Sequence, residues 1–345
     1  MKIVQLLASQ GHGGLEKHFV ELSLALSAWH ETHCIAPAEF AHYFENTPVI
    51  FHPMDLQGWR YRPITHRRLA KLLRDIRPDV LHAQANKAAT LAKFHLHSCR
   101  ISVATIHNRK SSTGMFGAYD GLVSVSRGAA NNVRHPKIRV IHNGIAALAE
   151  PSSQKCGRLR RRLTDGQPLI LAVGRLVKAK GFDLLIPAMK DIQARLVIAG
   201  TGPDQAVLQQ CIEKNKIHNV RLLGHRDDIP ELMEACDLFV ISSRNEGFPY
   251  VLIEALHSRR IILSTPIPDA LEFIPKSALV PIADTHSIHQ LLNRTLDNID
   301  QLRVEYRPFH EKAQTVLTLD NMVKQTADFY ELLLNEKQTL DKSRR

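Results

Sequence analysis

The strongest constraint on the fold is an alternation of short apolar runs with amphipathic helical patterns along most of the chain. This alternation is typical of a parallel β-sheet covered by helices on both faces, because parallel neighbours need a crossover connection. The expected strands are residues 2–8, 33–36, 49–52, 79–82, 102–106, 121–125 and 139–141, then 169–173, 195–199, 220–223, 238–242, 261–264 and 278–281. The sequence therefore predicts an α/β fold.

The alternation is interrupted once, by a polar stretch with Pro, Ser and Arg at residues 146–167. A chain of 345 residues holds roughly two domains at about 150 residues each. Near the end, Met322, Thr326, Phe329 and Leu333 recur at helical spacing. We therefore expect an N-terminal domain at 1–146, a linker at 147–167, a second domain at 168–318, and a C-terminal helix and tail at 319–345.

Composition excludes several classes of protein. Hydrophobic residues make up 44% of the chain, which excludes intrinsic disorder as the main state. No run approaches the roughly 18 uncharged apolar residues of a membrane-spanning helix. Five scattered cysteines fit neither a disulfide framework nor a CxxC zinc site, and favour a reducing, cytoplasmic location. The net charge of +11 leaves open an anionic substrate, an acidic membrane surface or nucleic acid.

A glycine-rich loop at residues 9–14 lies between the first expected strand and a helix. Gly13 and Gly14 would allow backbone amides to approach an anion at the helix start. The spacing matches neither the dinucleotide-binding fingerprint nor the P-loop. A tight strand–helix turn explains the same residues.

Two cations, Arg175 and Lys180, follow the expected strand 169–173. Ligands bind at the carboxyl ends of strands in open α/β sheets. Arg suits bidentate phosphate contacts and Lys acts as a point charge. The alternative is a solvated basic loop, to which we assign the intervening Lys178.

The loop after the expected strand 238–242 leads directly into another helix. Free amides at Gly247 and Phe248 could hold a phosphate near the helix start. Glu254 lies farther along, about 7–8 Å down the axis, where a carboxylate could accept both ribose hydroxyls. Glu246 lies in the loop itself. An exposed helix position is the alternative interpretation of Glu254.

Together these residues resemble the retaining group 1 glycosyltransferases of family four, which have the GT-B fold. In the second half the resemblance is carried by VGRLVKAKGFDLLI (173–186), RLVIAGTGP (195–203) and VRLLGHRDDIPELMEACDLFVISSRNEGFPYVLIEAL (220–256). In the first half it is carried by GHGGLEKH (11–18), DVLHAQ (79–84), TIHN (105–108), VSVS (123–126) and VIHNGI (140–145). The family's E-x7-E motif corresponds to Glu246 and Glu254.

The resemblance implies two Rossmann-like domains facing a central cleft, a C-terminal helix that crosses back to the first domain, and a nucleotide-diphospho-sugar donor. Arg175 and Lys180 match the diphosphate-binding pair, Glu254 matches the ribose ligand, and Glu246 matches the carboxylate at the donor sugar. The family retains anomeric configuration. No cofactor or metal is expected, because these cations and helix-start amides replace a metal at the leaving diphosphate.

The resemblance also implies roles for residues outside this loop pair. Gly14, with Gly13 beside it, matches the loop glycine near the donor phosphate. Gly247 and Phe248 lie in the segment whose amides reach the phosphate, and Leu223 lies where the backbone meets the base. His107 matches a histidine near the reactive centre, although a histidine that merely closes a strand is the alternative.

One segment departs from the family's pattern. After the expected strand 261–264 the family has a glycine-rich turn before a glutamate, whereas this chain reads STPIPDALE over 264–272. Glu272 could be the matching acid. Because this turn contributes to the donor side in the family, the donor's identity is not carried over.

The positive charge concentrates at residues 60–77, which hold seven basic residues and an apolar stripe. A basic amphipathic helix can lie on an anionic membrane surface, while an ordinary domain helix with its stripe toward the core is the alternative. Family members often extend membrane-anchored glycans. The preferred acceptor is therefore a glycan or glycolipid of bacterial lipopolysaccharide or O-antigen assembly. The expected location is cytoplasmic, with peripheral binding to the inner face of the membrane.

Two other functions compete with sugar transfer. A GT-B-fold nucleotide-sugar 2-epimerase would use the same donor, although the E-x7-E motif with its cationic loop favours transfer. A basic nucleic-acid-binding module would explain the charge. The chain lacks a zinc pattern and an RNP-like strand, and only 6% of its residues are aromatic, so nucleic acid is not an expected partner.

Overall fold

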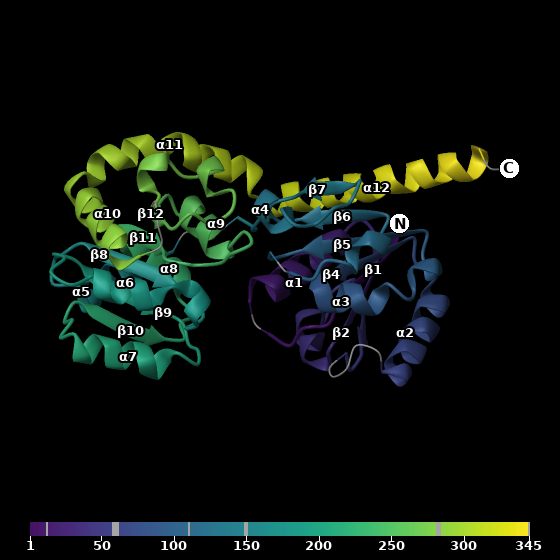
Figure 1. Cartoon of the computed structure of the whole chain (residues 1–345), viewed down its shortest axis with the longest axis horizontal. Helices are drawn as coiled ribbons and strands as arrows, with labels where there is room; N and C mark the ends of the chain where they lie inside the picture. Colours follow the sequence, from purple (N-terminus) through teal and green to yellow (C-terminus); the bar gives the residue numbers. More distant parts are fainter. Residues whose placement is uncertain (12, 57–61, 110, 148–150, 281–283, 344–345) are drawn as a thin grey trace. The chain divides into compact units, whose positions relative to one another are not determined.

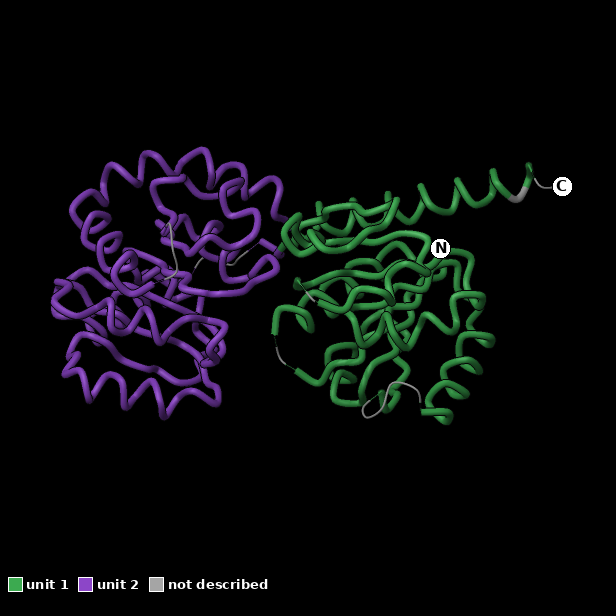
Figure 2. Tube along the Cα trace, in the orientation of Figure 1, with its two compact units in different colours: residues 1–144, 319–345 green, residues 145–318 purple. Residues whose placement is uncertain are grey.

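The computed structural model describes the chain except for residues 12, 57–61, 110, 148–150, 281–283 and 344–345 (Figure 1). The chain divides into two compact units (Figure 2). Unit 1 comprises Met1–Gly144 and Leu319–Arg345, and unit 2 comprises Ile145–Thr318. Each unit contains a parallel sheet with flanking helices, so the predicted α/β architecture is confirmed.

Unit 1 is built on a seven-stranded parallel sheet with the order β3-β2-β1-β4-β5-β6-β7. The strands are β1 (Lys2–Leu7), β2 (Glu31–Ala36), β3 (Ile50–Pro53), β4 (Val80–Gln84), β5 (Ile101–Ile106), β6 (Gly121–Ser124) and β7 (Ile138–Val140). The helices are α1 (Gly14–Ser27), α2 (Pro63–Ile76), α3 (Ala85–Ala92), α4 (Arg127–Ala130) and α12 (Leu319–Ser343). The strand order reverses between β1 and β4, which places the ligand-binding crevice of such a sheet at their carboxyl ends.

Unit 2 has a five-stranded parallel sheet with the order β10-β9-β8-β11-β12. The strands are β8 (Leu169–Val173), β9 (Arg195–Ala199), β10 (Val220–Gly224), β11 (Leu238–Ile241) and β12 (Ile261–Ser264). The helices are α5 (Ser153–Leu163), α6 (Phe182–Ala188), α7 (Gln205–Lys214), α8 (Ile229–Ala235), α9 (Tyr250–His257), α10 (Thr285–Asp297) and α11 (Ile299–Val316). Here the order reverses between β8 and β11.

The strand expected at 278–281 does not form within the described residues. Lys276–Ala278 is a 3₁₀ turn, and Leu279 makes a single bridge to Ser264. The Val280 amide donates to the Ser264 carbonyl at 2.8 Å, which ends the pairing in the described part of this segment. Residue 281 lies outside the described residues.

Helix α5 lies within the segment expected as a linker. Arg160 of α5 donates to the Ala235 carbonyl at 2.6 Å and pairs with Asp237 at 2.7 Å. These contacts tie α5 to the end of α8 and the start of β11. Most of the 147–167 segment is therefore an integral part of unit 2.

Helix α12 returns from unit 2 to pack on unit 1, as the resemblance implied. Its buried face includes Phe329 and Leu333, which share an apolar core with Ile3 and Leu22. The helix lies so close to β6 that a Cβ on Gly121 would be 2.7 Å from both Phe329 Cζ and Leu333 Cδ1. None of the described helices combines the length and apolar character needed to span a bilayer.

Candidate active site

The switch point of unit 2 brings together the loops that follow β8 and β11 (Figure 1). Lys180 Nζ lies 2.6 Å from Glu246 Oε1, and Ser243 Oγ donates to the same oxygen at 2.7 Å. The Lys180 and Glu246 side chains are 23% and 11% exposed. Two residues singled out separately from the sequence thus form one partly buried ion pair at the ligand-binding edge of the sheet.

The two loops approach each other at a glycine. Gly181 adopts the left-handed conformation with φ 69°, and a Cβ there would lie 1.9 Å from the Ser242 carbonyl oxygen. Ser242 Oγ donates to the Lys180 carbonyl at 2.8 Å, and the Arg244 amide donates to the Ala179 carbonyl at 2.8 Å. Only glycine satisfies both the backbone angle and the close contact.

Arg244, which was not among the predicted site residues, connects the two loops through its side chain. Its guanidinium makes a two-pronged contact with Asp183 at 2.6 and 2.9 Å and donates to the Lys178 carbonyl at 2.8 Å. Hydrogen bonding to Asp183 raises the pKa of the guanidinium further. Arg244 therefore joins the β11 loop to the middle of the β8 loop and to the first turn of α6. Its position two residues before Glu246 was the only signal in the sequence.

Arg175 lies on the same edge of the sheet, in a loop held by a second set of glycines. A Cβ on Gly200 would lie 2.0 Å from the Gly174 oxygen, and one on Gly202 would lie 2.3 Å from the Leu176 oxygen. The β8 and β9 loops are thus packed backbone to backbone. The Arg175 side chain is exposed and makes no hydrogen bond or ion pair with any described residue.

The segment expected to hold phosphate and ribose leads into α9. Gly247 and Phe248 are buried, and the Phe248 ring packs edge-on against Phe273 at 5.5 Å between centroids. Glu254 is half-buried at the fifth residue of α9, as its predicted position on a helix required. Leu223 is the extra residue of a bulge in β10, because the residues on either side of it pair with consecutive residues of β9.

The turn that departs from the family's pattern supports the loop carrying Glu246. Thr265 Oγ1 donates to the Ser243 carbonyl at 2.6 Å, and the Thr265 amide donates to Ile241 at 2.9 Å. Phe273, at the end of the same turn, supplies the ring beneath Phe248. The glycine-poor sequence therefore braces the β11 loop through a buried hydroxyl.

The glycine loop of unit 1 closes on its own carboxylate. Gly14 begins α1, and the Gly13 amide donates to Glu16 Oε2 at 2.9 Å. Ser9 Oγ donates to the other Glu16 oxygen. Gly13 and Gly14 are exposed, so the loop lies at the surface, but Glu16 occupies the Gly13 amide that was expected to face an anion.

His107 directly follows β5 and is buried. Its Nε2 lies 2.9 Å from Gln84 Oε1, and its ring packs edge-on against His18 at 4.8 Å. Burial holds the pKa of His107 well below its usual value and lowers the pKa of His18 to about 4. Both rings are therefore neutral near pH 7. His18 and Gln84 were not singled out from the sequence, although both lie in segments that carried the resemblance.

Comparison with known families decides the assignment. A model of glycosyl transferases group 1 matches residues 158–308, and a model of glycosyltransferase family 4 matches residues 12–147. The chain belongs to the group 1 glycosyltransferases. The first matched region contains the loops that follow β8, β9 and β11, and the second contains His107.

Two of the curated relatives of this glycosyltransferase are named for lipopolysaccharide core biosynthesis and for phosphatidylinositol. The lipopolysaccharide core biosynthesis glycosyltransferase LpsD of Rhizobium meliloti is 27% identical over 70% of this chain and 72% of its own length. The phosphatidylinositol N-acetylglucosaminyltransferase GPI3 subunit of Saccharomyces cerevisiae is 24% identical over 56% of this chain. The match spans only 45% of GPI3, less than half of that relative.

A solved structure with the same architecture is that of HepE from Anabaena, in complex with UDP. It superposes with a TM-score of 0.85 at 19% identity, covering 96% of this chain and all of HepE. The GT-B fold implied by the sequence is thereby confirmed.

Proposed function

We propose that this chain is a retaining glycosyltransferase that moves a sugar from a nucleotide-diphospho-sugar to a hydroxyl group of an acceptor. The observation that carries the proposal is the Lys180–Glu246 pair at the switch point of unit 2, in a chain of the group 1 family. A cation for the diphosphate and a carboxylate for the sugar meet at the edge where open α/β sheets bind ligands.

Each part of the donor has its own binding residues in this proposal. Arg175 and Lys180 bind the diphosphate, and Glu246 contacts the sugar. Exposed Arg175 has guanidinium donors that no described residue occupies. Glu254 binds the ribose from α9. The remaining contacts are the Gly247 and Phe248 amides at the phosphate, Leu223 at the base, and Gly13, Gly14 and His107 from unit 1.

In the reaction, the acceptor oxygen bonds to the anomeric carbon as the bond from that carbon to the diphosphate oxygen breaks. Negative charge develops on the leaving nucleoside diphosphate, where Arg175 and Lys180 stabilise it. The departing phosphate oxygen takes the proton of the acceptor hydroxyl on the same face, which retains the anomeric configuration. Because fixed cations neutralise the leaving group, no metal ion is required.

Donor binding tests this function directly. Thermal unfolding with UDP, GDP, ADP and their sugars should show an increase in Tm with one nucleotide family, because a ligand that binds only the folded state stabilises it. The complex of HepE with UDP makes uridine nucleotides the first to test. Proton NMR of the product then reports whether the anomeric configuration is retained. No shift with any nucleotide contradicts the proposal.

The 2-epimerase alternative predicts a different product. Incubation of the bound nucleotide-sugar without acceptor would then convert the sugar at C2. A transferase leaves the sugar intact or releases it slowly to water. Mass-neutral conversion to the epimer, followed by NMR, would favour the alternative over sugar transfer.

We propose a glycolipid acceptor of the bacterial envelope and a cytoplasmic enzyme that is peripheral to the membrane. LpsD supports the acceptor class, and α2 supports the membrane contact. Its apolar residues Leu69 and Leu73 are buried in unit 1, while its basic face is exposed. The exposed basic residues of this face are Arg67, Arg68, Lys71 and Arg74, whereas Arg60 lies outside the described residues.

Vesicle co-sedimentation tests the membrane contact. Binding to vesicles containing phosphatidylglycerol should weaken with salt, because exposed charges are screened. Replacing Arg67, Arg68, Lys71 and Arg74 with Gln should abolish it. Replacing exposed Lys190, Lys214 and Lys216 of unit 2 is the control and should leave binding unchanged. Equal partition onto neutral and anionic vesicles would contradict the membrane contact.

A further inference from the structure

A chain of buried hydrogen bonds crosses unit 1 from α12 to His107. Tyr330 of α12 accepts from Gln5 Nε2 at 3.2 Å, and Gln5 Oε1 accepts from Gln84 Nε2 at 2.9 Å. Gln84 Oε1 lies 2.9 Å from His107 Nε2. The Tyr330 hydroxyl oxygen also lies 2.5 Å from His82 Nδ1. Each of these residues is at most 8% exposed.

The bond directions along this chain determine one another. Because the Gln84 amide nitrogen donates to Gln5, the Gln84 oxygen is the acceptor that faces His107. His107 must therefore carry its proton on Nε2, which leaves Nδ1 as a hydrogen-bond acceptor. At the other end, the Tyr330 hydroxyl accepts from Gln5 and so donates to His82 Nδ1.

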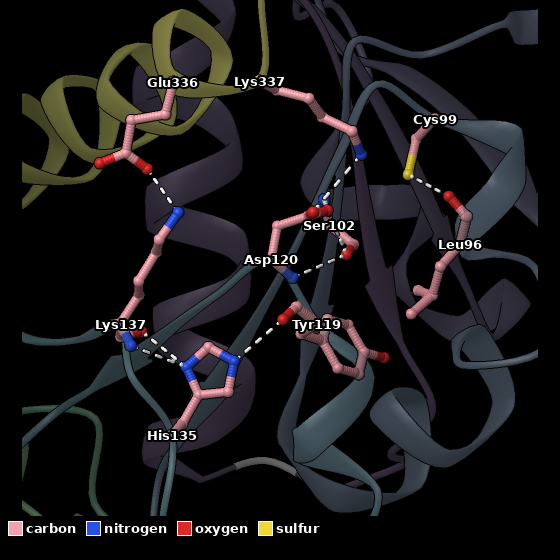
Figure 3. Close-up of polar contacts among 9 residues, drawn as sticks. All are labelled: Leu96, Cys99, Ser102, Tyr119, Asp120, His135, Lys137, Glu336 and Lys337. Atoms are coloured by element: carbon pink, nitrogen blue, oxygen red, sulfur yellow. Dashed lines mark hydrogen bonds and ion pairs between the residues drawn. The ribbon is translucent and has the colours of Figure 1, made fainter. Parts of the chain in front are cut away.

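Helix α12 is also held on unit 1 by ion pairs that lie beyond Tyr330 along the helix. The far part of the helix is fixed by Lys337 against Asp120 at 3.4 Å and by Glu336 against Lys137 at 2.5 Å (Figure 3). Asp120 also accepts from the Ser102 amide and hydroxyl at 2.8 Å, which anchors it to β5. The ring of Tyr330 is thereby held among the strands rather than at the surface.

We propose that Tyr330 is a positioning residue that, through Gln5 and Gln84, holds His107 in the tautomer that presents Nδ1 as an acceptor for a hydroxyl of the bound sugar or acceptor. The inference deepens the proposed function and rests on it. It makes the docking of α12 a condition for an ordered histidine, although Tyr330 itself touches no substrate.

The mechanism of this coupling is the orientation of two amide groups. Without the Tyr330 hydroxyl, the Gln5 nitrogen keeps only His82 Nδ1 as an acceptor, at the longer distance of 3.4 Å, so the Gln5 amide turns over more readily. A turned Gln5 would present its nitrogen to Gln84, which must then turn as well. Gln84 would present a donor to His107 Nε2, and the proton of the ring would move to Nδ1.

The test uses Tyr330→Phe in the full chain, which removes one hydroxyl and keeps the ring. The matched control is Thr326→Val, which removes another buried hydroxyl from the same helix, bonded only within α12 to the Met322 carbonyl. Long-range ¹H–¹⁵N correlations of the histidine rings report tautomers directly. His107→Gln assigns the His107 signals by their loss.

We expect His107 to hold its proton on Nε2 in the unaltered protein and in Thr326→Val, and to become a mixture of tautomers in Tyr330→Phe. Turnover in Tyr330→Phe should fall on the order of tenfold, less than the hundredfold that a misplaced catalytic geometry can cost. The KM for the donor should change less than turnover, because the cations proposed to bind the diphosphate lie in unit 2 and are not altered.

Gln5→Leu interrupts the same chain at its middle and should reproduce both effects if Tyr330→Phe fails to fold. An unchanged His107 tautomer in folded Tyr330→Phe or Gln5→Leu overturns the proposal, as does an equal change in Thr326→Val. If the unaltered protein transfers no sugar from any donor, the proposed function fails, while the ring spectra still decide whether Tyr330 positions His107.

Discussion

Each unit contributes one half of the candidate residues, and these two halves are built from opposite chemistry. In unit 2, charged side chains meet at partly exposed loops, with Lys180 against Glu246 and Arg244 against Asp183. In unit 1, His107 ends a chain of neutral polar groups that is almost fully buried. Charged groups keep access to water or to a counter-charge, whereas neutral polar groups can be buried wherever their hydrogen bonds are satisfied.

Under the proposed function, this difference corresponds to a division of labour between charged and neutral residues. Exposed cations can exchange a protein partner for a substrate phosphate, because part of their solvation is retained. A buried neutral network cannot easily rearrange, and it fixes orientation instead. In the mechanism we propose, unit 2 supplies charge to the leaving group, and unit 1 supplies a histidine of defined tautomer.

The sharpest test of the charged half is Lys180→Ala. Loss of the ammonium group removes stabilisation from the leaving diphosphate and leaves Glu246 without its counter-ion. We expect kcat/KM to fall by about 10²–10³-fold, with a lower kcat and a higher donor KM. Steady-state kinetics with the donor identified by thermal shift measure both.

Lys178→Ala is the control for this change. Lys178 is exposed in the same loop, and its carbonyl accepts from Arg244 and from the Gly181 amide, contacts that the substitution leaves in place. Kinetics close to those of the unaltered enzyme are expected. If Lys180→Ala retained full activity, the assignment of the diphosphate to this loop would be wrong.

The close approach of the two charged loops depends on Gly181. In Gly181→Ala, a methyl group meets the Ser242 oxygen in a left-handed conformation, so unit 2 should lose about 3 kcal/mol of unfolding free energy. Urea unfolding measures the loss. Gly166→Ala, at φ 93° with no neighbour within 4 Å of the added Cβ, should cost only about 1 kcal/mol. Equal losses would show that backbone angle alone matters at Gly181.

Acid should weaken the neutral half first. Burial lowers the pKa of His18 to about 4 and of His82 to about 3, and it also lowers that of His107. The unfolded chain then binds protons that the folded rings do not. In the unfolded chain each histidine has its usual pKa of 6.5. The free energy of unfolding is therefore unaffected by these rings above pH 6.5 and decreases as the pH falls below it. The loss is about 1.4 kcal/mol per pH unit per group.

Hydrogen exchange measured by mass spectrometry, corrected for the intrinsic pH dependence, separates the two units. Opening of β1, β4 and β5 should become easier between pH 7 and pH 5 by more than that of β8 and β11. His42→Gln, at an exposed histidine, should leave the change of opening free energy with pH as it is in the unaltered protein. If the opening free energy changed equally with pH in both units, the rings of His18, His82 and His107 would not be held neutral in the folded protein.

The charged half could largely be predicted from the sequence, and the neutral half could not. Lys180 and Glu246 each stand in a loop that follows a strand whose buried run is easy to recognise, and Glu254 lies in the helix after the second loop. Tyr330 and Gln5 are 325 residues apart, and no local pattern joins them. Their contact exists only because α12 returns to unit 1.

The fold was predicted for a related reason. Strands buried on both faces give near-continuous apolar runs, so twelve of the expected strands are present. The expected strand at 278–281 was wrong because an apolar run beside prolines can also be a buried turn. Arg244 and Thr265 were not predicted because each bonds to a different loop, and no local sequence pattern marks such a contact.

Thr265 gives the smallest and most specific test of the charged half. Thr265→Val keeps the shape of the side chain but leaves the Ser243 carbonyl without its 2.6 Å hydrogen bond. Thr164→Val removes a similar buried hydroxyl, bonded to the Gln167 carbonyl at 2.7 Å, at the other edge of unit 2. Both changes should cost about 1 kcal/mol of stability. Only Thr265→Val should also lower turnover, by about fivefold, because 1 kcal/mol of lost positioning is close to that factor. Equal turnover in the two variants would mean that the glycine-poor turn braces the fold and not the Glu246 loop.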